Sequence, residues 1–153
     1  MQKTLIIADN AGGADILAHF VLKNKNKYLF FICLRGPAKK IFKERCPGIK
    51  NIALNDFIRK YKRENSLILT GTSYHSNFES KAIKQAKQRG MFCVSFLDHW
   101  VGYKERFLPG FLPNEIWVGD KFAFELALRE GFAKNKLRLV PNPLFKKIKS
   151  LGL

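Results

Sequence analysis

Short apolar runs alternate along the chain with longer amphipathic segments. Most of these runs are nearly continuous in Ile, Leu, Val and Phe, which is typical of strands covered on both faces, as in a parallel sheet. The pattern predicts about six to seven strands, at residues 5–8, 28–34, 67–70, 92–97, 115–118 and 137–140, with a weaker one at 52–54.

Helix signals fill the intervals between the apolar runs. Pro37 suits the first turn of a helix, and Asn55 and Asp120 are suited to cap helices. Ser76 and Glu79 have the spacing of a capping box. Strand–helix–strand repeats of this length form right-handed crossovers. We therefore expect an α/β fold, a Rossmann-like, doubly wound and mostly parallel sheet with helices on both faces, at residues 14–22, 37–45, 56–63, 81–89 and 121–130.

The length and composition suit one domain. The chain has 153 residues, of which 46% are hydrophobic and 26% charged, and this is ordinary for a globular domain. We expect residues 1–153 to form a single Rossmann-like domain, with 141–153 as an exit linker towards a second domain. The sequence shows no signal peptide and no apolar run of about 18 residues, so we expect a cytoplasmic protein.

The positive net charge of the chain indicates which classes of partner it could bind. Lys and Arg number 28 against 12 Asp and Glu, a formal net charge of +16. Nucleic acid, an anionic membrane surface and phosphorylated small molecules are the three partner classes that fit such an excess. Much of the lysine is scattered, which is also typical of a solvated surface. Nucleic acid is the least expected of the three, because most aromatic residues lie in apolar runs and no nucleic-acid-binding motif is visible.

The cysteines indicate neither a disulfide framework nor a metal site. Cys33, Cys46 and Cys93 are odd in number, far apart and without CxxC spacing, so we expect buried thiols in a reducing compartment. No bound metal and no cofactor is predicted.

A glycine pair follows the first predicted strand. Gly12 and Gly13 allow close backbone approach, and with Asn10 they precede a helix whose free N–H groups favour anions. The turn lacks the third glycine of GxGxxG and the lysine of a P-loop, and nearby Asp9 and Asp15 count against a dense phosphate site. A tight strand-to-helix connection explains the same residues equally well.

Two more polar turns follow predicted strands. After the fourth strand, Thr72, Ser73 and His75 could hold a hydroxylated or anionic group, although a capped helix with a polar lead-in is the alternative. After the fifth, the loop contains Asp98, His99, Trp100, Tyr103 and Arg106. Loops at the carboxyl ends of strands are where open α/β sheets bind ligands, so we expect the three turns to converge along one edge of the sheet.

The third turn offers the most chemistry. Asp98 and His99 are placed for acid–base catalysis, Trp100 and Tyr103 offer flat faces for a sugar ring or base, and Arg106 suits a phosphate. A local cluster of salt bridges and aromatic rings that holds the loop is the structural alternative.

In their order, these segments resemble the N-terminal domain of GT-B glycosyltransferases and their relatives, including nucleotide-sugar 2-epimerases. The resemblance spans nearly the whole chain and rests on Ala11-Gly12-Gly13, Thr70-Gly71-Thr72-Ser73, Ser95-Phe96-Leu97-Asp98-His99-Trp100, Glu115-Ile116-Trp117-Val118-Gly119-Asp120 and Val140-Pro141-Asn142-Pro143.

The resemblance implies that two domains bind different substrates. In that family the N-terminal domain generally binds the sugar acceptor, and a C-terminal domain binds most of the nucleotide-sugar donor. It implies that Gly12 and Gly13 line the acceptor cleft, that Asp98 or His99 is the base, and that Asn142 lies at the passage between the domains. The resemblance also implies that no metal is needed. Many such enzymes use lipid-linked acceptors at the inner membrane face, which a basic surface would suit.

The sequence stops where the donor domain of such an enzyme would begin. The resemblance therefore predicts an acceptor-binding half of a glycosyltransferase of bacterial surface polysaccharide or glycolipid synthesis, inactive until a second domain or subunit supplies the donor. A stand-alone binding module for a nucleotide or phosphorylated sugar is the alternative, and a basic nucleic-acid-binding protein is the second.

Overall fold

The computed structural model describes residues 1–61, 63–74, 76–98 and 102–140. The described residues form a seven-stranded sheet in which every neighbouring pair is parallel. Its order, β3-β2-β1-β4-β5-β6-β7, confirms the predicted doubly wound α/β fold. The strands are β1 (Gln2–Ala8), β2 (Tyr28–Leu34), β3 (Lys50–Asn51), β4 (Ser66–Thr70), β5 (Cys93–Leu97), β6 (Glu115–Val118) and β7 (Leu137–Leu139).

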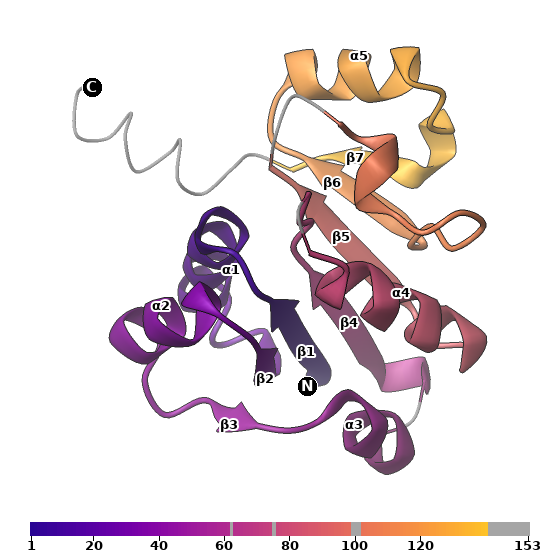
Figure 1. Cartoon of the computed structure of the whole chain (residues 1–153). Coiled ribbons are helices and arrows are strands. Elements are labelled where there is room, and N and C mark those ends of the chain that lie inside the picture. Colours follow the sequence, from indigo (N-terminus) through magenta and orange to yellow (C-terminus); the bar gives the residue numbers. More distant parts are fainter. Residues whose placement is uncertain (62, 75, 99–101, 141–153) are drawn as a thin grey trace, which may run out of the picture.

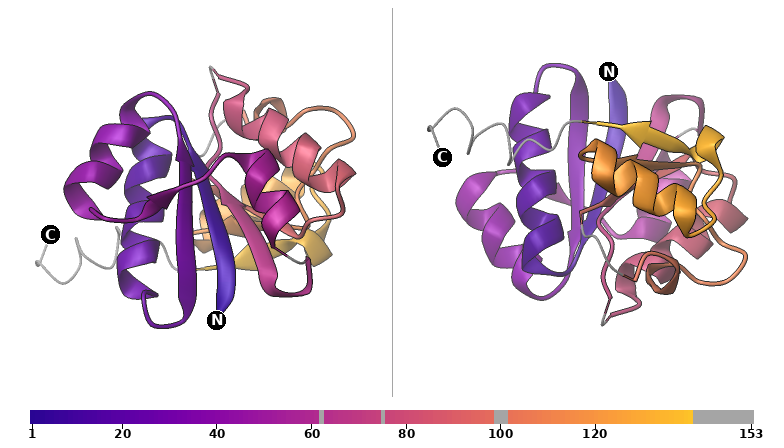
Figure 2. Two further views of the ribbon diagram at one scale, coloured as in Figure 1. Left: turned by 90° about the horizontal axis from the view of Figure 1, so that it is seen from below. Right: turned by 90° about the horizontal axis from the view of Figure 1, so that it is seen from above.

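Helices cover both faces of this sheet (Figures 1 and 2). Leu5 and Ile7 of β1 point into a core shared with three helices, whereas Ile6 and Ala8 point into a second core with the other two. This alternation follows from the period of two along a strand. Helices α1 (Ala11–Lys23) and α2 (Pro37–Arg45) cover the second core, and α3 (Leu54–Lys60), α4 (Phe78–Gln88) and α5 (Lys121–Arg129) cover the first.

The order in which strands are added to the sheet changes direction between β1 and β4. From β1 the chain moves outward to β2 and β3, then returns so that β4 pairs with β1, from Lys3 opposite Ser66 to Ile7 opposite Thr70. The two loops that leave this pair of strands go to opposite faces of the sheet, which opens a crevice at their carboxyl ends. The fold thus places the first and second polar turns side by side.

Two predicted helix starts are confirmed. Pro37 occupies the first turn of α2, and Asp120 caps α5 by accepting a hydrogen bond from the backbone N of Ala123 at 2.8 Å. The prediction for Asn55 is wrong. Leu54 packs into the core and already begins α3, so Ala53 is the capping residue, and the side chain of Asn55 accepts a hydrogen bond from Gln85.

The third strand also differs from the prediction. It consists of Lys50–Asn51 and begins two residues before the apolar residues 52–54. The backbone N of Ile52 still donates to the carbonyl of Ile32 at 3.0 Å, but the chain then turns into α3. Leu54 enters the core as the first residue of α3, whereas Ile52, which precedes the helix, packs partly buried against the same core.

The predicted capping box at the start of α4 is wrong. The helix begins at Phe78, and Ser76 accepts a hydrogen bond from the backbone N of Phe78 at 3.2 Å. Glu79 does not return to Ser76. Its side chain, only 1% exposed, turns inward and contacts Ser73.

The three cysteines are free, with Cys46 and Cys93 buried and Cys33 half-buried. No helix in the described part of the chain has the length and apolar character to cross a membrane.

Candidate functional site

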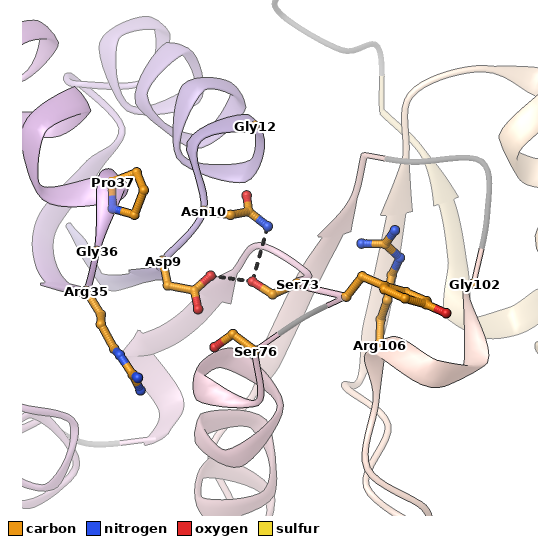
Figure 3. A pocket seen from close by; sticks show the side chains of 11 residues that line it. Asp9, Asn10, Gly12, Arg35, Gly36, Pro37, Ser73, Ser76, Gly102 and Arg106 are labelled. Carbon is orange, nitrogen blue, oxygen red and sulfur yellow. Dashed lines mark hydrogen bonds between the residues drawn. The ribbon is translucent and has the colours of Figure 1, made fainter.

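A cavity of about 900 Å³ opens at the carboxyl edge of the sheet (Figure 3). Four segments, which follow β1, β2, β4 and β5, supply its walls. The three polar turns therefore meet at one edge, as the sequence predicted, and the segment after β2 joins them. The lining residues are Asp9, Asn10, Gly12, Arg35, Gly36, Pro37, Ser73, Tyr74, Ser76, Gly102 and Arg106.

Asn10 joins two of these segments. Its Oδ1 accepts a hydrogen bond from the backbone N of Gly13 at 2.8 Å and caps α1, as short polar side chains commonly do. Its Nδ2 donates to Ser73 Oγ at 3.1 Å. One side chain thus ties the first turn of α1 to the turn after β4.

Ser73 also contacts two carboxyl groups. Its hydroxyl is hydrogen-bonded to Asp9 and to Glu79. All three side chains are buried, with 7% of Asp9, 5% of Ser73 and 1% of Glu79 exposed. Asp9 and Ser73 line the cavity, whereas Glu79 lies behind them.

The two carboxyl groups have opposite pKa shifts. The pKa of Glu79 is raised to about 8: burial is the largest cause, the hydrogen bond with Ser73 acts to lower it, and the charge of Asp9, a hydrogen bond with Asp9 and the charge of Asp98 act to raise it. Burial also acts to raise the pKa of Asp9, but hydrogen bonds with Ser73, Ser76 and Glu79 outweigh it and lower that pKa. At neutral pH the cavity therefore faces an ionised Asp9 in front of a neutral Glu79.

Arg106 brings a positive charge to the other side of the cavity. It ends a short 3₁₀ turn, Lys104–Arg106, and only 5% of it is exposed. Its Nη1 donates to the carbonyl of Thr72 at 3.0 Å, and its guanidinium carbon lies 5.5 Å from the ring centroid of Tyr74. Burial lowers the pKa of Arg106, while the charge of Asp98 acts to raise it.

Two residues near Arg106 lie outside the cavity lining. Thr72 is 1% exposed, and its Oγ1 lies within hydrogen-bonding distance of Asp98 at 3.4 Å and of the Phe96 carbonyl at 3.3 Å. Asp98 is half-buried beside it. These predicted site residues hold the turns after β4 and β5 together.

The structure corrects the prediction for Tyr103. This side chain is 0% exposed and packs 6.4 Å from Phe132, so its ring cannot stack on a ligand. Burial raises the pKa of Tyr103 to about 12, and its hydroxyl has no hydrogen-bond partner among the residues that the structure describes. The loop turns back under α5 at this point and uses the ring as core.

Seven lining residues were not predicted as site residues: Asp9, Arg35, Gly36, Pro37, Tyr74, Ser76 and Gly102. Tyr74, which is 50% exposed, offers the aromatic face that was expected of Tyr103. Arg35 follows β2 and is exposed, with its guanidinium carbon 5.8 Å from the ring centroid of Phe78. Its position at the end of a predicted strand, next to Gly36 and Pro37, was the available signal.

Four predicted site residues, His75, His99, Trp100 and Asn142, lie outside the described residues, as does the expected linker at 141–153. Within residues 1–61, 63–74, 76–98 and 102–140, no group of three or more His, Cys, Asp or Glu is placed to hold a metal ion.

Comparison with solved structures identifies the fold. The chain superposes on the Staphylococcus aureus MnaA–UDP co-structure with a TM-score of 0.67 at 15% identity, covering 97% of this chain and 47% of that one. A UDP-N-acetylglucosamine 2-epimerase gives a TM-score of 0.66 at 10% identity, with 92% and 48% covered. The chain thus has the GT-B-like fold of one half of these proteins and spans about half their length. No protein-family model and no curated protein matches the sequence.

Proposed function

We propose that this chain is the acceptor-binding half of a GT-B-type glycosyltransferase of bacterial surface polysaccharide or glycolipid synthesis. One observation carries the proposal: in a chain with the fold of half of a UDP-sugar enzyme, four strand-end turns form a single cavity at the switch point. In open α/β sheets this is where ligands bind.

The lining suits a sugar that carries an anionic group. Asp9 and Ser76 present oxygen acceptors for sugar hydroxyls, and Tyr74 adds an exposed aromatic face. Figure 3 shows Arg35 and Arg106 on either side of Asp9. Guanidinium groups bind phosphate oxygens through charge-assisted hydrogen bonds. A glycosyl phosphate combines all of these features.

The remaining parts of the reaction are assigned by the resemblance. A nucleotide-sugar donor would be held by a second domain or subunit. By the resemblance, His99 or Asp98 would deprotonate the acceptor, and Asp98 would do so from its place against Thr72, next to Arg106. A lipid-linked acceptor would place the protein at an anionic membrane surface. There, each well-placed Lys or Arg of the +16 chain would contribute about 1 kcal/mol.

Binding to the isolated chain tests the proposal. We would titrate N-acetylglucosamine 1-phosphate and UDP-N-acetylglucosamine into the protein and follow the backbone amides of Gly12, Gly36 and Gly102 by NMR. The expected result is that both probes shift these cavity amides and that the nucleotide adds no affinity. Arg59→Met is a matched control, because Arg59 is exposed on α3 and does not line the cavity. Shifts at other sites only would overturn the proposal.

A stand-alone binding module is the second candidate. One observation favours it: four segments of this one chain line a cavity of about 900 Å³, large enough for a small ligand. Tighter binding of UDP-N-acetylglucosamine than of the sugar phosphate, without any partner protein, would support the module and count against the acceptor half.

A further inference from the structure

The hydroxyl of Ser73 lies at the centre of three polar groups. Asn10 Nδ2 donates to Ser73 Oγ at 3.1 Å, and the carboxyl groups of Asp9 and Glu79 are both in hydrogen-bonding contact with the same oxygen. Figure 3 shows the contacts of Ser73 with Asp9 and Asn10.

The number of protons in this cluster is fixed by its chemistry. A serine hydroxyl has one proton to donate and two lone pairs with which to accept. Asn10 uses one lone pair, and the single Ser73 proton can reach only one of the two carboxyl groups. The other carboxyl group therefore brings its own proton, which it can donate to the second lone pair of Ser73 or to the facing carboxylate. The cluster is complete with one proton for two carboxyl groups.

Burial indicates which group holds that proton. Glu79 is 1% exposed, and its Oε2 has no hydrogen-bond partner in the described part of the chain. A charge on this oxygen would be costly, because a buried charge needs pairing and hydrogen bonds. Asp9 instead lines the cavity and also interacts with Ser76 and with the backbone of Asn10. Glu79 is the acid, and Asp9 is the carboxylate.

The neighbouring charges agree with this assignment. Asp9 faces Glu79 from the end of β1, and Asp98 acts on it from the end of β5. Arg106, in the loop after β5, is a positive group that interacts with it. Among the described residues, the charges of Asp9 and Asp98 oppose a further negative charge on Glu79, and the charge of Arg106 favours one.

We propose that Glu79, Ser73 and Asp9 form a directed hydrogen-bond relay. In it, Glu79 holds the single proton, Ser73 donates to Asp9, and the ionised Asp9 accepts a hydrogen bond from a hydroxyl of the bound ligand. Glu79 is thus a positioning residue that acts through Ser73, and the ligand is one that presents a hydroxyl donor. Only the identity of that ligand, a sugar, rests on the proposed function.

The relay fails in a defined way when Glu79 ionises. The Ser73 proton must then serve two carboxylates, so Asp9 loses its fixed donor and a second negative charge lies behind it. Glu79→Gln separates proton from charge, because the amide still donates to Ser73 Oγ but cannot ionise. The amide also nearly preserves the volume of the side chain.

The protonation of Glu79 is tested without any ligand. We would label glutamate side-chain carboxyl groups with ¹³C in the full chain and follow them by NMR from about pH 5 to about pH 10. One carboxyl group should titrate near pH 8 in the wild-type protein and be absent from Glu79→Gln. It should persist in Glu125→Gln, in which an exposed glutamate of α5 is changed. If Glu79→Gln fails to fold, the same transition must appear at the wild-type Gly71 and Ser73 amides. Glutamates that all titrate in the ordinary acidic range would overturn the relay.

A second experiment distinguishes failure of the relay from failure of the proposed function. N-acetylglucosamine is an uncharged probe, so changes in its binding report the protein. Its affinity should fall about fivefold, the effect of one hydrogen bond, as pH rises through about 8, and it should stay level in Glu79→Gln. A titrating Glu79 without sugar binding would reject the proposed function alone. Sugar binding with the same pH profile in both proteins would reject the relay alone.

Discussion

Gly13 and Gly71 bring the turns after β1 and β4 into backbone contact. A Cβ atom on Gly13 would lie 3.6 Å from the Cα of Gly71 and 3.1 Å from Asn10 Oδ1. A Cβ atom on Gly71 would in turn meet Oε2 of Glu79. This close approach is what lets Asn10, Ser73 and Glu79 reach one another across the switch point.

Gly71→Ala should therefore displace the side chain of Glu79 and leave the backbone of the sheet in place. The backbone conformation at Gly71 is one that alanine can adopt, since its φ is not positive. The new methyl group would displace a buried carboxyl group, and we expect a loss of about 1–3 kcal/mol in the free energy of unfolding. Urea denaturation would measure it.

A double-mutant cycle isolates the cause of that loss. Glu79→Ala removes the side chain that the methyl group would meet, so Gly71→Ala should cost clearly less in that background. Equal costs in both backgrounds would show that the methyl group acts on something other than Glu79.

The stability of the protein should decline with rising pH between about 4.5 and about 8. The pKa of Glu79 is raised in the folded state, so the folded protein binds a proton that the unfolded chain releases over this range. The free energy of unfolding then falls as pH rises, by at most about 1.4 kcal/mol per pH unit for one proton, and levels off above the folded pKa. Urea titrations over a series of pH values would measure it.

Glu79→Gln is the control for this pH dependence. It removes the contribution of Glu79 and leaves that of Asp9, whose lowered pKa has the opposite sign: its stabilisation is lost as pH falls through the folded value. The difference between the two proteins should therefore change over the Glu79 range. Stability curves that run parallel from acid to alkaline pH would contradict the raised pKa of Glu79.

The fold could be predicted from the sequence because the apolar runs record burial on both faces. Ile6 and Ile7, for example, enter different cores, and the continuous run that includes them has no other simple explanation. The short third strand was misplaced because Leu54 packs equally well from a helix, and the local pattern does not distinguish the two.

The sequence predicted which turns form the site, because they follow strands, but not which side chains in those turns contact one another. Ser76 and Glu79 have the spacing of a capping box whether Glu79 turns back to the helix or inward to Ser73. The choice depends on the space left by Gly71 and on the position of Asp9, which are tertiary features. Likewise, nothing in the loop sequence states which of Tyr74 and Tyr103 is buried.

Substitutions of these two tyrosines should differ in their effects: the change at Tyr74 should weaken ligand binding, and the change at Tyr103 should not. Tyr103→Phe removes a buried hydroxyl without a hydrogen-bond partner among the described residues, so the free energy of unfolding should stay level or rise by up to about 1 kcal/mol. Sugar binding should not change. Tyr74→Ala removes a half-exposed ring from the cavity and should weaken sugar phosphate binding with little loss of stability. A binding defect in Tyr103→Phe would mean that this ring reaches the ligand after all.

The two arginines of the cavity should likewise separate binding from folding. Arg106 is buried and donates to the Thr72 carbonyl, so Arg106→Met leaves that acceptor without this donor and should cost about 1–3 kcal/mol of stability. Arg35 is exposed, so Arg35→Met should change stability by no more than about 0.5 kcal/mol.

Both variants should bind N-acetylglucosamine 1-phosphate about tenfold more weakly, because each loses a charge-assisted contact with the phosphate. Both should keep their affinity for the uncharged sugar. Calorimetric titration at low salt would measure the two affinities, with Arg59→Met as the control. Full phosphate affinity in both variants would show that the anionic group lies elsewhere and that only the hydroxyl acceptors of the cavity engage the sugar.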